Sequence, residues 1–183
     1  VHSSADAMAE LVRKHQLKVE DVTSIRALLS KDCMSLVCEP IEKKRRPSSG
    51  YDAQFSIPYA VASVLGRGRL TLAELEPEML HDPDILALCD KVTCEPDPKS
   101  AYPKYFSAEV IVTTRDGREL SHREQVNRGA DLRPLSGEEV IAKFRANAEM
   151  ACAPIRAEEL LCAVMDLDGG CTPEQVAELV LVV

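Results

Sequence analysis

A chain of 183 residues is long enough for one domain with a substantial core, or for one domain with an appendage. Its formal net charge of −8 argues against nucleic-acid binding, because a protein that neutralises phosphates needs a basic surface. The same charge disfavours an anionic membrane surface, and no apolar run approaches the ~20 residues that a membrane span requires. We therefore expect neither a nucleic-acid partner nor a membrane partner.

The cysteines and the N-terminal residues bear on the cellular compartment. Seven cysteines, an odd number without close-set pairs, are typical of a protein in a reducing environment. The sequence shows no signal peptide, so we expect a cytoplasmic location. It opens at Val1 without an initiator Met, which indicates a fragment of a longer polypeptide.

The first part of the chain predicts a helix followed by two strands. Ser3 or Ser4 can cap a helix that ends near Gln16. Residues 21–30 alternate between apolar and polar side chains, which predicts a strand. We predict a second, shorter strand over residues 33–38.

A basic loop then precedes the most apolar helix of the sequence. Residues 39–50 contain two prolines and the basic run Lys43-Lys44-Arg45-Arg46, which predicts a loop. Ser56 is a suitable N-cap, because Pro58 fits only the first turn of a helix. The residues from there to Gly66 are apolar on two faces, which predicts a central helix that is covered on both sides.

The middle of the chain predicts a short helix, a strand and a hairpin. Asp82-Pro83-Asp84 is a helix start, and residues 91–95 form a strand. Alternating residues follow from position 106, and Asp116-Gly117 turns the chain back. A two-residue loop would place apolar side chains opposite polar ones, whereas a three-residue loop pairs Val112 with Leu120, so we predict a bulged hairpin.

Three helices close the chain, the first of them capped by Ser136. Helices together with a separate antiparallel meander predict an α+β fold, a two-layer sandwich of an antiparallel sheet and helices with a C-terminal helical tail. We place the domain boundary so that residues 1–135 form the α+β domain and residues 136–183 form the tail.

Two stretches resemble the 2-methylcitrate dehydratase (MmgE/PrpD) family. The first is Tyr51-Asp52-Ala53-Gln54-Phe55-Ser56-Ile57-Pro58-Tyr59-Ala60-Val61-Ala62, and the second is Arg133-Pro134-Leu135-Ser136 with Lys143-Phe144 after it. The resemblance spans nearly the whole chain but only the C-terminal part of such an enzyme. It implies a smaller, lid-like domain whose tail packs on an all-helical domain absent here, and a homodimeric parent protein.

The resemblance also implies a reaction. Such enzymes are lyases without a cofactor that act on a di- or tricarboxylate: a base removes a proton next to a carboxylate, and a β-hydroxyl leaves as water. Decarboxylases and epimerases of the family are alternatives. Because the absent domain supplies much of the machinery, we expect this chain to be inactive alone. The rival interpretation is a non-catalytic α+β module for ligand binding or dimerisation.

His2 is the first candidate site residue. It matches a family His that stands just before a helix and is associated with the active-site cleft, so the resemblance implies proton transfer or substrate binding. The alternative is a frayed terminal residue.

The other candidates are Arg46 in the basic run, Ser48 and Ser49 just after it, and Tyr59 in the predicted central helix. Arg46 can hold a carboxylate in a bidentate fork, and family members place this loop, with Ser48 and Ser49, near the cleft. The alternative is a solvated loop. Tyr59 can donate a hydrogen bond to a substrate, or it can be a core tyrosine whose hydroxyl is satisfied.

The spacing of four cysteines resembles that of a metal site. Cys33-x4-Cys38 and Cys89-x4-Cys94 resemble two halves of a zinc site. A separation of five residues, however, puts two side chains on opposite faces of a strand, and structural zinc sites usually have tighter spacing. We expect no metal and no cofactor.

Overall fold

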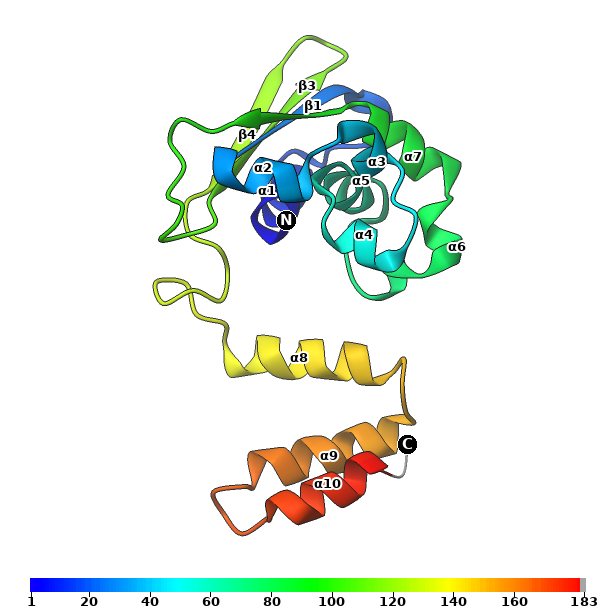
Figure 1. The fold of residues 1–183 in the computed structure, drawn as a ribbon, viewed down its shortest axis with the longest axis vertical. Coiled ribbons are helices and arrows are strands. Elements are labelled where there is room, and N and C mark those ends of the chain that lie inside the picture. Colours follow the sequence, from blue (N-terminus) through cyan, green and yellow to red (C-terminus); the bar gives the residue numbers. More distant parts are fainter. Residues whose placement is uncertain (182–183) are drawn as a thin grey trace. The chain divides into compact units, whose positions relative to one another are not determined.

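The computed structural model describes residues 1–181, and the chain divides into two compact units (Figure 1). The first unit is Val1–Pro134, and the second begins at Leu135. Each unit is described by itself.

One four-stranded sheet organises the first unit, with the strand order β2-β1-β3-β4. The strands are β1 (Val22–Leu29), β2 (Val92–Pro96), β3 (Ala108–Thr114) and β4 (Glu119–Glu124). β3 pairs antiparallel with both β1 and β4, whereas β2 runs parallel to β1. The α+β class is confirmed, but the sheet is mixed rather than wholly antiparallel. The long helical connection between β1 and β2 is the kind of crossover that brings a chain back to pair in parallel.

Seven α-helices belong to the described part of this unit. They are α1 (His2–His15), α2 (Lys31–Val37), α3 (Ile41–Arg45), α4 (Gly50–Gln54), α5 (Ile57–Arg67), α6 (Pro77–Leu80) and α7 (Pro83–Asp90), with single 3-10 turns at Val19–Asp21 and Ala73–Leu75. α1 packs on β3 and β4, and α5 packs on β2, α1 and α7. Figure 1 shows α1 and α5 together on one side of the sheet, which makes a two-layer sandwich.

The predicted central helix is confirmed as α5. The Ser56 hydroxyl accepts a hydrogen bond from the amide of Tyr59 at 3.0 Å, and Pro58 occupies the first turn. Every residue from Ile57 to Leu65 is buried. The helix continues one residue beyond Gly66 and is capped by Gly68, whose positive φ of 74° is readily adopted by glycine. This helix is covered on both of its apolar faces.

Of residues 33–38, predicted as a strand, residues 33–37 belong instead to helix α2, and Cys38 is the residue that caps it. The Ser30 hydroxyl accepts a hydrogen bond from the amide of Asp32 at 3.3 Å, and the Asp32 carboxylate favours the first turn of the helix. The predicted loop over residues 39–50 likewise contains the short helix α3. Local capping therefore prevails over an apolar run that is too short to distinguish strand from helix.

The predicted bulged hairpin is confirmed. Val112 pairs with Leu120, and Thr114 and Arg118 close a three-residue loop, with the Thr114 amide donating to the Arg118 carbonyl oxygen at 2.9 Å. Gly117 occupies the loop with φ 83°, a conformation that glycine adopts without strain. The ladder begins at Ala108, so Phe106 lies outside it.

The second unit contains α8 (Gly137–Ala148), α9 (Pro154–Met165) and α10 (Pro173–Leu181). The Ser136 capping box is confirmed: its hydroxyl accepts from the Glu139 amide at 3.1 Å, and its own amide donates to the Glu139 carboxylate at 2.8 Å. α9 packs against α8 and α10. Among residues 1–181, no helix is long and apolar enough to cross a membrane.

Candidate functional site

The N-terminal end of α1 presents two polar side chains on one face. His2 opens the helix with an exposed side chain, and Asp6, partly exposed, follows four residues later on the same face. The opposite face of α1 lies in the core and includes Ala7, Met8 and Leu11. An imidazole and a carboxylate therefore lie one helical turn apart at the surface.

Two segments form hydrogen bonds with this end of α1: the one before β3, at Phe106, and the loop after β4. The Ser3 hydroxyl donates a hydrogen bond to the carbonyl oxygen of Phe106, and the Phe106 amide donates to the Asn127 side chain at 3.0 Å. Arg128, the next residue, donates from Nη2 to Asp6 Oδ1 at 3.1 Å. The loop after β4 thus meets the first turn of α1 both directly and through Phe106.

An aromatic pair borders the same place. The Phe106 ring is 58% exposed and packs edge-on against Tyr102, with 5.4 Å between the ring centroids. Because the Phe106 backbone is bonded to Ser3, this apolar surface lies beside the start of α1. We call His2, Asp6, Phe106 and Arg128 the α1 cluster.

The loop that carries Arg128 is held by a buried carboxylate. Arg133 binds Glu124 through Nη1, and the same nitrogen donates to the Val126 carbonyl oxygen at 3.2 Å. Glu124 is buried and also bonds His122 Nε2 at 3.1 Å. Within the loop, the Gly129 amide donates to the Arg133 carbonyl oxygen at 2.8 Å. These contacts fix where the chain returns toward α1.

Arg46, Ser48 and Ser49 are bonded to residues outside the α1 cluster. Arg46 Nη2 lies 2.7 Å from Asp90 Oδ2, and this hydrogen bond holds the pKa of the Asp90 carboxyl below its usual value. Ser48 donates to the Asp52 carboxylate, and Ser49 caps α4 by accepting from the Asp52 amide at 3.1 Å. A substrate carboxylate at Arg46 would compete with Asp90.

Tyr59 lies in the core. Its hydroxyl donates to the Glu74 carbonyl oxygen at 2.5 Å and contacts the Met79 carbonyl oxygen at 3.3 Å. Burial raises the pKa of the Tyr59 hydroxyl, so it stays protonated. The hydroxyl of Tyr59 is bonded to the carbonyl oxygens of Glu74 and Met79, whereas Arg46 is bonded to Asp90 of α7. None of these bonds involves a residue of the α1 cluster.

A cavity of about 360 Å3 lies beside β2. Cys38 and Cys94 both line this cavity, and the neighbouring Cys38 thiol together with burial raises the pKa of Cys94. Arg45 also lines the cavity and donates from Nη2 to the Val92 carbonyl oxygen at 2.8 Å, while its buried Nε has no hydrogen-bond partner among the described residues. The wall of this cavity therefore contains one cysteine from each of the two spaced pairs. In the described part of the chain, no group of three His, Cys, Asp or Glu residues could hold a metal ion.

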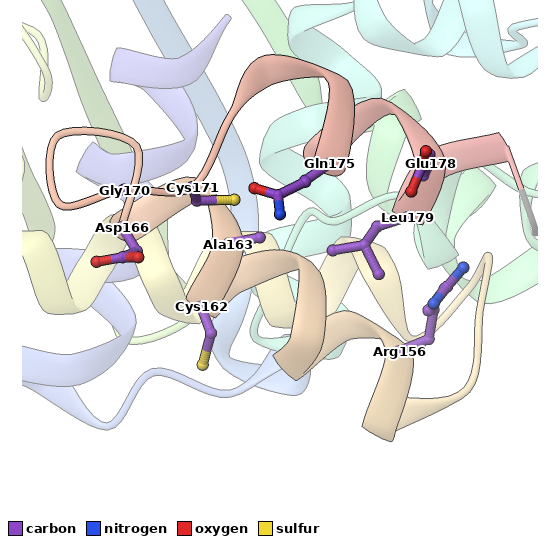
Figure 2. Close-up of a pocket in the computed structure, with 9 residues that line it drawn as sticks. All are labelled: Arg156, Cys162, Ala163, Asp166, Gly170, Cys171, Gln175, Glu178 and Leu179. Carbon is purple, nitrogen blue, oxygen red and sulfur yellow. The ribbon is translucent and has the colours of Figure 1, made fainter.

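A second cavity, of about 840 Å3, lies between α9 and α10 in the second unit (Figure 2). It is lined by Arg156, Cys162, Ala163, Asp166, Gly170, Cys171, Gln175, Glu178 and Leu179. Figure 2 shows Ala163 and Leu179 in the space between the two helices. Its two carboxylates outnumber its one arginine, and that arginine is paired with Glu159 at 3.1 Å. This cavity is poorly suited to an anion.

Comparison with known proteins decides the family. The model of the MmgE/PrpD C-terminal domain matches residues 1–169. The chain belongs to the MmgE/PrpD family. The resemblance inferred from Tyr51–Ala62 and from Arg133–Ser136 is confirmed.

The curated relatives of this MmgE/PrpD chain include two kinds of lyase. The cis-aconitate decarboxylase of Mus musculus is 29% identical over 174 residues, which cover 91% of this chain and 34% of the mouse protein. The Homo sapiens decarboxylase gives the same figures. The 2-methylcitrate dehydratase of Cupriavidus necator is 27% identical over 161 residues, or 80% of this chain and 31% of that protein. The chain spans about a third of the length of these relatives.

Sequence reasoning missed two polar members of the α1 cluster in this MmgE/PrpD chain. Asp6 carried a usable signal, because it stands one helical turn after His2. Arg128 carried none, since its partner Asp6 is 122 positions away along the chain. The concentrated charge at Lys43–Arg46 predicted an anion site at the end of α3, where both arginines already have carboxylate and carbonyl partners.

Proposed function

We propose that this chain is the smaller, C-terminal domain of a cofactor-independent lyase that acts on a di- or tricarboxylate. The observation that carries the proposal is the family match over residues 1–169, together with relatives that are a dehydratase and decarboxylases. We take elimination of water after proton abstraction as the reaction, with decarboxylation or epimerisation as alternatives within the family.

His2 is the residue of this chain to which we assign contact with the reacting substrate. An imidazole titrates near neutral pH and can therefore give or take a proton during an elimination. Its position supports the assignment: the side chain is exposed at the start of α1, and the rest of that helix is anchored in the core by Met8 and Leu11. A base on a rigid element holds its geometry better than one on a loop.

The second unit supports the proposal that a helical domain completes the enzyme. α8 has no buried residue along its length, and apolar side chains of all three helices are exposed, including Val140 at 52%, Ile155 at 74% and Met165 at 68%. These exposed side chains are available to pack against another domain. We propose that α8–α10 pack on the helical domain of a longer polypeptide, which acts as a homodimer in the cytoplasm and supplies most of the catalytic groups.

The test uses the full-length protein that contains this chain. We expect it to turn over 2-methylcitrate, cis-aconitate or a related acid, and the 183-residue chain alone to be inactive. His2→Ala should lower kcat by about 100-fold or more, as expected for a lost proton-transfer group. His15→Ala is the matched control, because His15 is an exposed histidine at the other end of α1, and it should leave kcat unchanged.

Two results would contradict the assignment. Full turnover by a folded His2→Ala protein removes His2 from the reaction. A full-length wild type that converts none of these acids, yet binds one of them or dimerises, would instead favour a non-catalytic α+β binding or dimerisation module.

A further inference from the structure

The di- or tricarboxylate proposed above must be held by a cation near His2. Two arginines are paired with buried carboxylates: Arg123 of β4 binds Asp97, and Arg133 of the loop after β4 binds Glu124. Arg46 is paired with Asp90 on α7. Arg128 differs from them because it is bonded to Asp6, which lies on the same exposed helix face as His2.

We infer that Arg128 binds a carboxylate of the substrate in the α1 cluster, and that Asp6 positions its guanidinium. This inference rests on the proposed function. A guanidinium presents its N–H groups in a planar fork that matches a carboxylate, which makes arginine the preferred residue for this task. The Arg128 side chain is 51% exposed, so an anion from solvent can approach it.

The backbone geometry supports a built site rather than a mobile surface arginine. Arg128 follows Asn127, whose side-chain oxygen accepts a hydrogen bond from the Phe106 amide. The carbonyl oxygen of Phe106 in turn accepts a hydrogen bond from the Ser3 hydroxyl. The guanidinium is then held by Asp6 at 3.1 Å. A long side chain that is already ordered loses less conformational entropy when it binds a ligand.

The neighbouring aromatic surface suits the rest of such a substrate. Phe106 is exposed and packs edge-on against Tyr102, and its backbone is bonded to Ser3 of α1. The methylene groups of a polycarboxylate can pack on the Phe106 ring while one carboxylate is bound by Arg128.

The experiment compares variants of the full-length protein with its preferred acid as substrate. Arg128→Ala should raise KM by about tenfold or more, the expected loss for a hydrogen bond to a charged group, and should lower kcat by a smaller factor. Arg128→Lys should recover part of the loss, because the charge remains but the fork is gone. Asp6→Asn should raise KM by a smaller factor than Arg128→Ala does. Asp6→Glu keeps the carboxylate, so its KM should be close to the wild-type value.

Arg118→Ala is the matched control. Arg118 is also an exposed arginine paired with an aspartate, Asp116 at 2.7 Å, but it lies on the β3–β4 hairpin. Its substitution should leave KM unchanged, and thermal unfolding should show that every variant is folded. A KM for Arg128→Ala equal to the wild-type value, or an equal rise in Arg118→Ala, overturns the inference.

Direct binding separates this inference from the proposed function. Titration calorimetry with tricarballylate, an unreactive tricarboxylate, measures the contact without turnover. If the wild type binds it and Arg128→Ala binds about tenfold more weakly, Arg128 holds a carboxylate whatever reaction follows. If both proteins bind it equally, or neither binds, Arg128 does not have this role. Failure of the lyase proposal appears separately, as a wild type that converts no acid.

Discussion

Arg123 Nη1 of β4 lies 2.7 Å from Oδ2 of Asp97, the residue that follows β2, although β2 and β4 are the opposite edges of the sheet. Nη2 of the same arginine bonds Asp97 Oδ1 at 3.0 Å and Glu109 of β3 at 2.7 Å. The Asp97 side chain is fully buried. One guanidinium therefore joins three segments across the sheet.

We expect Arg123→Met to destabilise the protein by about 3 kcal/mol, because it leaves a buried carboxylate without its cation. Urea unfolding of the wild type and the variant measures the difference. Arg118→Ala, which removes an exposed ion pair, should change the free energy of unfolding by less than about 1 kcal/mol. Equal effects of the two substitutions would show that the Arg123 network adds little.

The same network predicts how stability depends on pH. The Arg123 guanidinium holds the pKa of Asp97 below its ordinary value of 3.8. A carboxyl whose pKa is lower in the folded state stabilises the protein above its unfolded pKa, and this contribution is lost as the pH falls through the folded pKa. The free energy of unfolding should therefore decline below about pH 4. In Asp97→Asn the decline should be shallower, and an identical profile would contradict the assignment.

Gly50 is predicted to be intolerant of any side chain. A Cβ at this position, the first residue of α4, would lie 2.5 Å from the Leu75 carbonyl oxygen, a backbone atom that cannot move by itself. Gly50→Ala should cost about 1–3 kcal/mol in unfolding free energy. Gly137→Ala is the matched control, since Gly137 is also the first residue of its helix and a Cβ there meets no neighbouring atom. Chemical denaturation measures the unfolding free energy of both variants. A loss in Gly50→Ala that Gly137→Ala does not show would confirm that the contact with Leu75 excludes a side chain.

Thiol reactivity should distinguish the buried cysteines from the exposed one. Burial raises the pKa of Cys89 to about 12, so very little thiolate forms near neutral pH. Iodoacetamide at pH 8 should therefore alkylate the exposed Cys162 well before the buried Cys89. Mass spectrometry of a time course gives the order. Rapid modification of Cys89 in the folded protein would show that α7 opens more readily than its packing indicates.

Much of the fold follows from local patterns in the sequence. The Ser56 cap and Pro58 locate the start of α5, and the pairing of apolar with apolar residues sets the register of Val112 with Leu120. These features depend on neighbouring residues, so the sequence contains the information directly. The helix at α2 was missed because a six-residue apolar run is ambiguous, although the Ser30 cap was a readable signal.

The rest depends on contacts between distant residues. The parallel pairing of β2 with β1 requires knowledge of how the intervening helices fold back, which no local pattern provides. The same holds for the α1 cluster, where Arg128 meets Asp6 only after the loop beyond β4 has returned to the first helix. The family resemblance pointed to His2, but its surroundings had to come from the three-dimensional structure.

The parallel β1–β2 pair has a consequence for the order of assembly. The loop between β3 and β4 has three residues, so pairing these two strands costs little chain entropy. Pairing β2 with β1 costs more, because about sixty residues lie between the two strands. Native contacts that span long stretches of chain form slowly. The hairpin is thus placed to form first and β2 to dock last, which makes β2 the strand whose amides should exchange soonest under mildly denaturing conditions.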